Sequence, residues 1–263
     1  MLTTSAVKIL NTYFNKILLL TIERNLYRLD DIRKNYNGLN FEVFMGIDGN
    51  TLNIKELQKK GEIAEDINAV YKQDNREYLN LKVGPLLNNQ IAVASSHKKI
   101  YQYIIDNQLD KVLILEDDSI PVLKNFEFLA ETLKQVPTNC ELLFLGHILN
   151  NDFSFFGKFK YLHLTNFLYN IGLKFDSVIR KKKSYPLDFS SLLKKQGGHI
   201  GTHAYALIGN GAATLLEIQT PLKHGASDLL LMDVVAKHQI NSYTCKYMFF
   251  EQNSNLLSSV YNS

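Results

Sequence analysis

The chain has 263 residues, of which 46% are hydrophobic and 21% charged, a composition typical of a folded globular protein and not of a disordered one. Its net charge of +3 is too small to indicate nucleic-acid binding through the whole surface. Its two cysteines show neither metal-ligand spacing nor a disulfide pattern, and no apolar run reaches roughly 18 residues, so we expect a cytoplasmic protein without a membrane span.

Strand and helix patterns alternate along most of the sequence. Apolar runs of β type predict strands at residues 16–22, 41–44, 112–115, 141–145, 205–208 and 243–250. Helical periodicity predicts helices at residues 26–36, 89–107, 126–133, 212–218 and 228–238, and residues 51–82 read as a mixture of helix and loop. This alternation predicts one α/β domain over residues 1–263, with a mostly parallel central sheet and helices on both faces.

Residues 147–200 interrupt the alternation and predict an inserted basic, aromatic lobe or loop at the edge of the domain. Between residues 158 and 195 the chain carries nine Lys and Arg against two Asp. The basic run 180–183 is either a solvated loop or a contact for an anionic acceptor or the inner face of the cytoplasmic membrane. Near an anionic membrane surface each Lys or Arg contributes about 1 kcal/mol. Such a peripheral contact would suit a lipid-linked saccharide acceptor.

Three acids, Glu116, Asp117 and Asp118, follow directly on the apolar strand 112–115. On an extended chain Glu116 and Asp118 point the same way, and at roughly 6–7 Å they would repel by about 2–3 kcal/mol. A divalent cation would relieve this repulsion, and Mg²⁺ and Mn²⁺ both prefer oxygen ligands. The triplet therefore predicts a metal site, and its alternative is a solvated strand end before the turn at Pro121.

Polar residues also follow the first two strands. Arg24 and Asn25 come after the first strand and Asp48 after the second. Because ligands bind beyond the carboxyl ends of strands in open α/β sheets, these residues and the acidic triplet suit a nucleotide whose diphosphate is neutralised by a metal. The sequence has no glycine-rich dinucleotide motif after the first strand, no P-loop and no Gly-x-Ser-x-Gly motif, which disfavours those routes to phosphate binding or hydrolysis.

Several segments, in this order, resemble glycosyltransferase family 25, the lipooligosaccharide galactosyltransferase group related to the collagen galactosyltransferases. These segments are 20–24, 47–49, 90–97, 112–118, 201–208 with Gly211-Ala212, and 252–254. The resemblance covers most of residues 16–255 apart from the expected lobe. It implies a GT-A-type fold and transfer of a hexose, often galactose, from a UDP-sugar to a saccharide or glycolipid acceptor of a bacterial surface glycan, with inversion and with Mn²⁺ or Mg²⁺.

The resemblance also implies roles for individual residues. Asp118 would be the direct metal ligand, and Glu116 or Asp117 would orient ribose, water or the ion. Arg24 and Asp48 would contact the nucleoside end. The residues expected to bind the nucleotide are Arg24, Asn25, Asp48, Gly49, His97, Glu116 and Asp117, and those expected near the metal are Glu116, Asp117 and Asp118.

An inverting transfer needs a general base for the acceptor hydroxyl. Asp228 is either this base or an ordinary acid in the first turn of a helix, and Asp233, His203 and His224 are further candidates. His97 lies on the apolar stripe of its helix, where it is either a core histidine or a site residue, and His203 is either a loop histidine or a catalytic one.

Two other functions stay open. The first is a nucleotide-sugar or glycan binding protein of the same fold without turnover, supported by residues 89–93, which replace the family's Gly-Glu-Ile-Gly-Cys. The second is a nucleotidyltransferase, which also uses metal-bound carboxylates but ordinarily carries a glycine-rich first loop.

Overall fold

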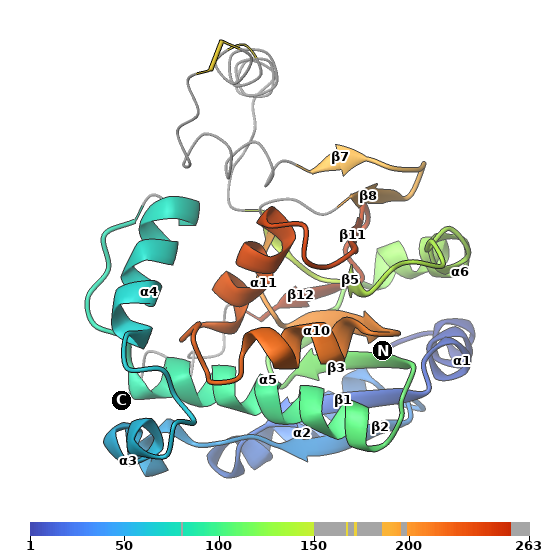
Figure 1. Cartoon of the computed structure of the whole chain (residues 1–263). Coiled ribbons are helices and arrows are strands. Elements are labelled where there is room, and N and C mark those ends of the chain that lie inside the picture. Colours follow the sequence, from blue (N-terminus) through green and yellow to red (C-terminus); the bar gives the residue numbers. More distant parts are fainter. Residues whose placement is uncertain (80, 150–166, 168–170, 173–185, 196–198, 254–263) are drawn as a thin grey trace.

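The computed structural model describes residues 1–79, 81–149, 167, 171–172, 186–195 and 199–253 (Figure 1). Its centre is an eight-stranded sheet in the order β2-β1-β3-β10-β5-β11-β8-β7. The strands are β1 (Lys16–Thr21), β2 (Phe41–Met45), β3 (Lys111–Glu116), β5 (Leu142–Phe144), β7 (Leu187–Asp188), β8 (Leu193–Lys195), β10 (Ala204–Ile208) and β11 (Ser242–Cys245). Two small sheets pair β4 (Ser119–Pro121) with β12 (Phe250–Gln252), and β6 (Ile148–Leu149) with β9 (His199–Ile200).

Most strands of the central sheet run in one direction; β10 is reversed in the middle of the sheet and β8 is reversed near one edge. Strands β2, β1 and β3 are parallel to one another, and β5 and β11 are parallel to each other. β10 is antiparallel to both β3 and β5, and its register places Ala204 opposite Leu115. The chain just before β10 therefore lies at the carboxyl end of β3. If β10 were parallel to β3, the chain after β10 would lie there instead.

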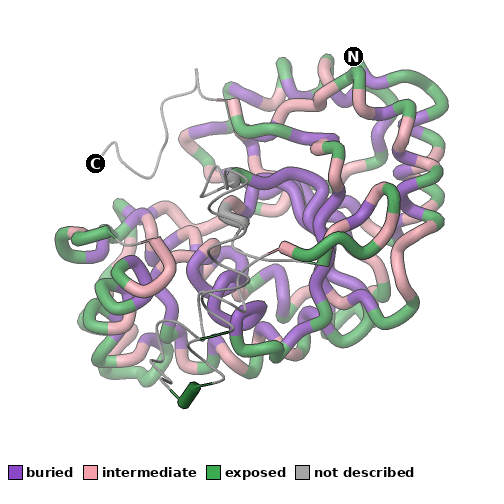
Figure 2. The backbone as a smooth tube through the Cα atoms, turned by 90° about the horizontal axis from the view of Figure 1, so that it is seen from above, coloured by how far each residue is buried: buried purple, intermediate pink, exposed green. Residues whose placement is uncertain are grey.

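Helices cover both faces of the sheet, as the alternating pattern predicts. On one face, α1 (Thr4–Tyr13), α2 (Leu29–Asn35) and α6 (Leu129–Lys134) pack against Leu113 and Leu115 of β3. On the other face, α5 (Asn88–Asp106), α10 (Gly211–Ile218) and α11 (Ser227–Ala236) pack against Val112 and Ile114. Consecutive side chains of β3 thus enter opposite layers, and Figure 2 shows the buried chain at the centre of the molecule.

A third apolar cluster supports a smaller helical group beside α5 and α11. The helical group consists of α3 (Ile54–Lys59), α4 (Ile67–Asp74) and the π-helical turn η3 (Asn75–Leu79). The buried residues of the cluster include Ile67 and Tyr71 of α4 and Met232 of α11. Figure 1 shows α4 next to the N-terminal end of α5. The expected mixture of helix and loop in residues 51–82 is thus three helical segments.

Other segments depart from the predicted elements. Residues 26–36 form the 3-10 helix η1 (Glu23–Arg28) followed by α2, and residues 126–133 form η4 (Leu123–Phe128) followed by α6. The single strand predicted at 243–250 is wrong, because the chain leaves the central sheet after β11 and re-enters a different sheet as β12. The aromatic residues there favour a strand by composition, but Phe249 and Phe250 are buried in the core as the chain crosses between sheets.

Only parts of the expected lobe at 147–200 are described. β7 and β8 extend the edge of the central sheet beyond β11, and β6 pairs with β9. The basic run 180–183 lies outside the described residues. Among the helices that are described, none is both long enough and apolar enough to cross a bilayer.

Candidate active site

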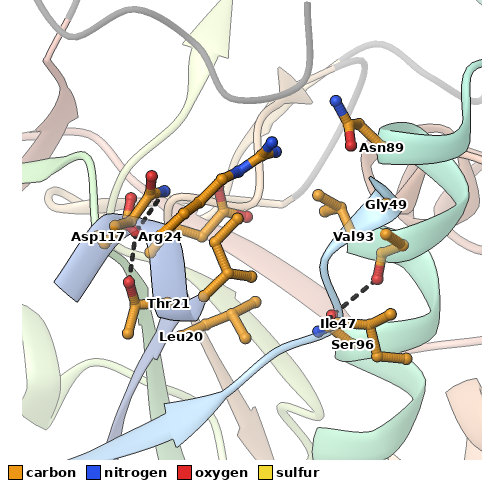
Figure 3. Close-up of a pocket in the computed structure, with 13 residues that line it drawn as sticks. Leu20, Thr21, Arg24, Ile47, Gly49, Asn89, Val93, Ser96 and Asp117 are labelled. Atoms are coloured by element: carbon orange, nitrogen blue, oxygen red, sulfur yellow. Dashed lines mark hydrogen bonds between the residues drawn. The ribbon is translucent and has the colours of Figure 1, made fainter. Parts of the chain in front are cut away.

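The acidic triplet lies where three neighbouring strands end. Beside it is a hollow of about 60 Å³, lined by the ends of β1 and β3, by η1, by η2 (Gly49–Thr51) and by the first turns of α5. We call it the strand-end hollow. Figure 3 shows Asp117 and Thr21 on one side of it, Asn89 and Val93 of α5 on the other, and Arg24 extending between them. The ends of β1, β2 and β3 therefore lie along one edge of the sheet, as expected.

Asp117 is buried, and both of its carboxylate oxygens are engaged. Oδ2 accepts hydrogen bonds from Thr21 Oγ1 at 2.6 Å and Asn25 Nδ2 at 2.9 Å, and Oδ1 pairs with Arg28 Nη1 at 2.6 Å. The partners come from the end of β1 and from η1, so Asp117 fixes η1 against the end of β3. This carboxylate shapes the hollow.

Glu116 is the last residue of β3 and is held from two sides. Its Oε1 atom lies 3.0 Å from His97 Nε2 and accepts the Thr202 hydroxyl at 2.5 Å. Burial disfavours the charged carboxylate, but the hydrogen bonds and charge from His97 and the hydrogen bond from Thr202 outweigh it and lower the pKa of Glu116. Thr202 is close because β10 runs antiparallel to β3.

His97 continues this contact into the core. Its other ring nitrogen, Nδ1, lies 2.8 Å from the Tyr205 hydroxyl, which lies 3.4 Å from the hydroxyl of Tyr101. His97 is only 1% exposed. The structure thus shows His97 as a core histidine that also binds a carboxylate of the site, so the two interpretations of its sequence position are not exclusive.

Asp118 is the least satisfied acid of the triplet. Its Oδ2 accepts from Gln252 Nε2 at 2.8 Å, whereas Oδ1 is buried and has no hydrogen-bond partner among the described residues. Burial, and then the negative charges of Glu116 and Asp117, raise the pKa of Asp118 to about 7. The raised pKa is consistent with the like-charge repulsion expected between Glu116 and Asp118.

The remaining nucleotide-binding candidates line or border the hollow. Arg24 Nε lies 3.4 Å from Asp48 Oδ2, and Asp48 also accepts a hydrogen bond from the Asn50 amide. Gly49 packs so tightly on the start of α5 that a Cβ there would lie 2.6 Å from the Asn89 Cα. A side chain at position 49 would push η2 away from the helix.

His203 is buried at the start of β10, and its ring lies over Gly146, where an added Cβ would be 2.5 Å from Nε2. Neither ring nitrogen makes a well-formed hydrogen bond with a described residue, although the nearby Phe250 carbonyl partly offsets the burial that lowers the pKa of His203. His203 does not line the strand-end hollow, and its catalytic role stays a prediction.

The two aspartates of α11 lie in different surroundings. Asp228 is in the first helical turn, where its Oδ1 accepts from the Leu229 amide at 2.9 Å; Ala226 is the N-cap. Burial raises the pKa of Asp228, and the charge of Glu116 adds to this effect. Asp233 is instead held by Tyr78 and Lys237, each at 2.6 Å, with His224 Nε2 at 3.7 Å.

The comparison with family models identifies the chain. The model of glycosyltransferase family 25, described as an LPS biosynthesis protein, matches residues 14–231. The chain belongs to this family. Membership supports glycosyltransferase activity in lipopolysaccharide biosynthesis. No curated protein matches the chain significantly.

The acidic end of β3 is the place where a metal site is expected in this family 25 chain. No group of three or more His, Cys, Asp or Glu within the described residues is arranged to hold a metal ion. The unpartnered buried oxygen of Asp118 does fit a cation that takes its other ligands from phosphate and water, as Mg²⁺ commonly does. The residues fit a metal brought with the nucleotide better than a resident ion in a protein cage.

The sequence did not single out some residues of the site. Thr202 and Gln252 lie within segments that carry the family resemblance, yet nothing in their spacing shows that they bind Glu116 and Asp118. Arg28 could have been suspected because a buried acid, Asp117, needs a cation. Tyr205 reads as an ordinary strand residue, and only the packing of β10 against α5 reveals its contact with His97.

Proposed function

We propose that this family 25 chain transfers a hexose, with galactose favoured, from a UDP-sugar to a saccharide acceptor during lipopolysaccharide or surface-glycan synthesis, with inversion and with Mn²⁺ or Mg²⁺. The observation that carries the proposal is the half-buried Asp118 carboxylate, which follows two other acids and whose buried Oδ1 atom has no partner among the described residues. A divalent cation bound with the diphosphate would satisfy that oxygen.

The residues around Asp118 have distinct tasks in this proposal. Asp118 would hold the ion, and Glu116, kept ionised by His97 and Thr202, would add negative charge beside it. The ion would offset the charge that develops on the departing UDP. Asp117 would position η1, so that Arg24 and Asn25 line the strand-end hollow, which would contact one part of the nucleotide.

Asp228 is the general base in this proposal. An inverting transfer removes the proton of the acceptor hydroxyl as its oxygen attacks the anomeric carbon, and UDP leaves from the opposite side. A carboxylate with a raised pKa is a stronger base than an ordinary aspartate. Asp233 is the weaker candidate, because its carboxylate is already bound by Tyr78 and Lys237.

Titration of the wild type and of Asp118→Asn with UDP, in the presence of MnCl₂ or EDTA, tests the proposal. We expect Mn²⁺ to tighten UDP binding to the wild type at least about tenfold, which corresponds to about 1.4 kcal/mol. The variant should keep the fold, as judged by circular dichroism, and lose this dependence. UDP binding that is equal with Mn²⁺ and with EDTA would refute metal assistance.

A binding protein of the same fold without turnover is the second candidate. Asn89, which stands within the altered segment 89–93, lines the strand-end hollow and packs against Gly49. Hydrolysis of UDP-galactose and UDP-glucose separates the two candidates, because a transferase hydrolyses its donor slowly and a binding protein does not. Cytoplasmic location and contact of the basic run 180–183 with an anionic membrane remain proposals from the sequence.

A further inference from the structure

A second and larger cavity lies on the other side of the first turn of α5. Its volume is about 470 Å³, within the range of about 300–1,000 Å³ that is usual for small-molecule sites. One wall comes from α4, η3 and residues 81–87, and the opposite wall is the start of α11. We call it the α4–α11 cavity.

The α4–α11 cavity and the strand-end hollow are neighbours. Asn89 lines the hollow and Gln90, the next residue of α5, lines the cavity. Asp228 also lines the cavity, and it is close enough to Glu116, which lines the hollow, for the two charges to interact. The two spaces therefore meet along the first turn of α5, and each has one acidic side chain of this pair in its lining.

The lining of the cavity combines an apolar surface with a few hydrogen-bonding groups. Leu79, Leu81 and Leu87 are apolar, and the Tyr71 hydroxyl accepts from Gln90 Nε2 at 2.8 Å, which leaves its own proton to donate. Asp228 is the one charged side chain among the described residues that line it. A sugar ring has an apolar C–H face and polar hydroxyls, so it matches this lining, whereas a phosphate would be repelled by Asp228.

Buried contacts fix the two walls relative to each other. His224, just before α11, lies 2.8 Å from Asp74 of α4, and Asp233 of α11 accepts the Tyr78 hydroxyl of η3 at 2.6 Å. These side chains lie beneath the cavity wall and do not line it. A cavity held in shape by such contacts loses less conformational entropy when a ligand binds.

We infer that the α4–α11 cavity is the acceptor site, and that it takes a neutral saccharide whose attacking hydroxyl is directed toward Asp228. This inference rests on the proposed function, and it adds the place and the chemical class of the acceptor. The apolar wall then selects the sugar face, and Tyr71 and Gln90 select its hydroxyl pattern.

Saturation-transfer NMR with four probes tests the inference: methyl β-galactoside, methyl β-glucoside, methyl α-mannoside and glucose 6-phosphate. The cavity variant is Leu81→Trp and its matched control is Leu187→Trp on β7, because both leucines are 51% exposed. We expect at least one neutral glycoside to bind the wild type and the control equally, and to bind Leu81→Trp about tenfold more weakly, a loss of about 1.4 kcal/mol. Gln90→Ala should weaken the same glycoside.

The inference is overturned if none of the neutral glycosides binds, if only glucose 6-phosphate binds, or if Leu81→Trp and Gln90→Ala bind the glycoside as the wild type does. The Mn²⁺–UDP titration of the wild type, run beside it, keeps the two proposals apart. If UDP binding depends on the metal but the glycoside binds Leu81→Trp and Gln90→Ala as it binds the wild type, the cavity is rejected as the acceptor site and the proposed function stands.

Discussion

The Nε2 atom of His97 lies 3.0 Å from the Oε1 atom of Glu116 and joins the core of the sheet to the acidic strand end. Among the described residues, His97→Phe would leave the mostly buried carboxylate with Thr202 as its hydrogen-bonding side chain. We expect a loss of about 1–3 kcal/mol in the free energy of unfolding, measured in urea at pH 7.5. In a Glu116→Gln background the same change should cost less, since the carboxylate is absent; equal costs in the two backgrounds would show that the contact is energetically unimportant.

The buried pair between Arg28 and Asp117 has a matched exposed counterpart. Arg28 and Asp117 side chains are 8% and 10% exposed, whereas Arg33 and Asp30 are 62% and 85% exposed at a separation of 3.9 Å. Arg28→Met should lower the free energy of unfolding by about 3–5 kcal/mol, because it strands a buried charge. Arg33→Met should change it by less than about 1 kcal/mol. Similar losses for the two variants in urea unfolding would contradict the structural role of Asp117.

Gly49, the first residue of η2, packs closely against the start of α5. Gly49→Ala would place a Cβ 2.6 Å from Asn89 Cα and 2.7 Å from its backbone nitrogen, neither of which can turn away. We expect a loss of about 1–3 kcal/mol in stability and weaker UDP binding, since the hollow lies between these elements. Gly84→Ala is the control, because a Cβ there meets nothing within 4 Å. An unchanged Gly49→Ala protein would show that η2 moves freely against the helix.

The pKa of Asp228 predicts the acid side of the rate profile. Its pKa is raised by burial and by Glu116, so the deprotonated base forms at higher pH than for an ordinary aspartate. The kcat should therefore rise with pH through a pKa above 3.8 and then level off. Asp228→Asn should reduce kcat by about 10²–10⁴-fold and abolish this limb, with UDP affinity unchanged. Asp228→Glu, which keeps a carboxylate, should retain the limb; a limb that survives in Asp228→Asn assigns the base elsewhere.

Asp233, the other aspartate of α11, is expected to have a structural role and not a catalytic one. Asp233→Asn removes a carboxylate bound by Tyr78 and Lys237, and we expect it to lower the free energy of unfolding by about 1–3 kcal/mol. Its effect on kcat should be small once folded protein is compared at equal concentration. A large loss of kcat in a stable Asp233→Asn protein would exchange the roles of the two aspartates.

The sequence by itself determined the α/β class, the long helix α5 and the acidic end of β3, because hydrophobic periodicity and the position of charges are local properties. The resemblance likewise pointed to the family that the match over residues 14–231 shows. The sequence could not assign different roles to Glu116, Asp117 and Asp118. All three are carboxylic acids, and they differ in role only through the residues that pack against them.

The tertiary structure determined which partners each of the three acids has. The reversed β10 brings Thr202 to Glu116, η1 brings Arg28 to Asp117, and β12 brings Gln252 to only one oxygen of Asp118. These partners lie 86, 89 and 134 residues away in the sequence, so no local pattern specifies them. Strand direction in the central sheet explains only the partner of Glu116; the partners of Asp117 and Asp118 depend on where η1 and β12 pack against the end of β3.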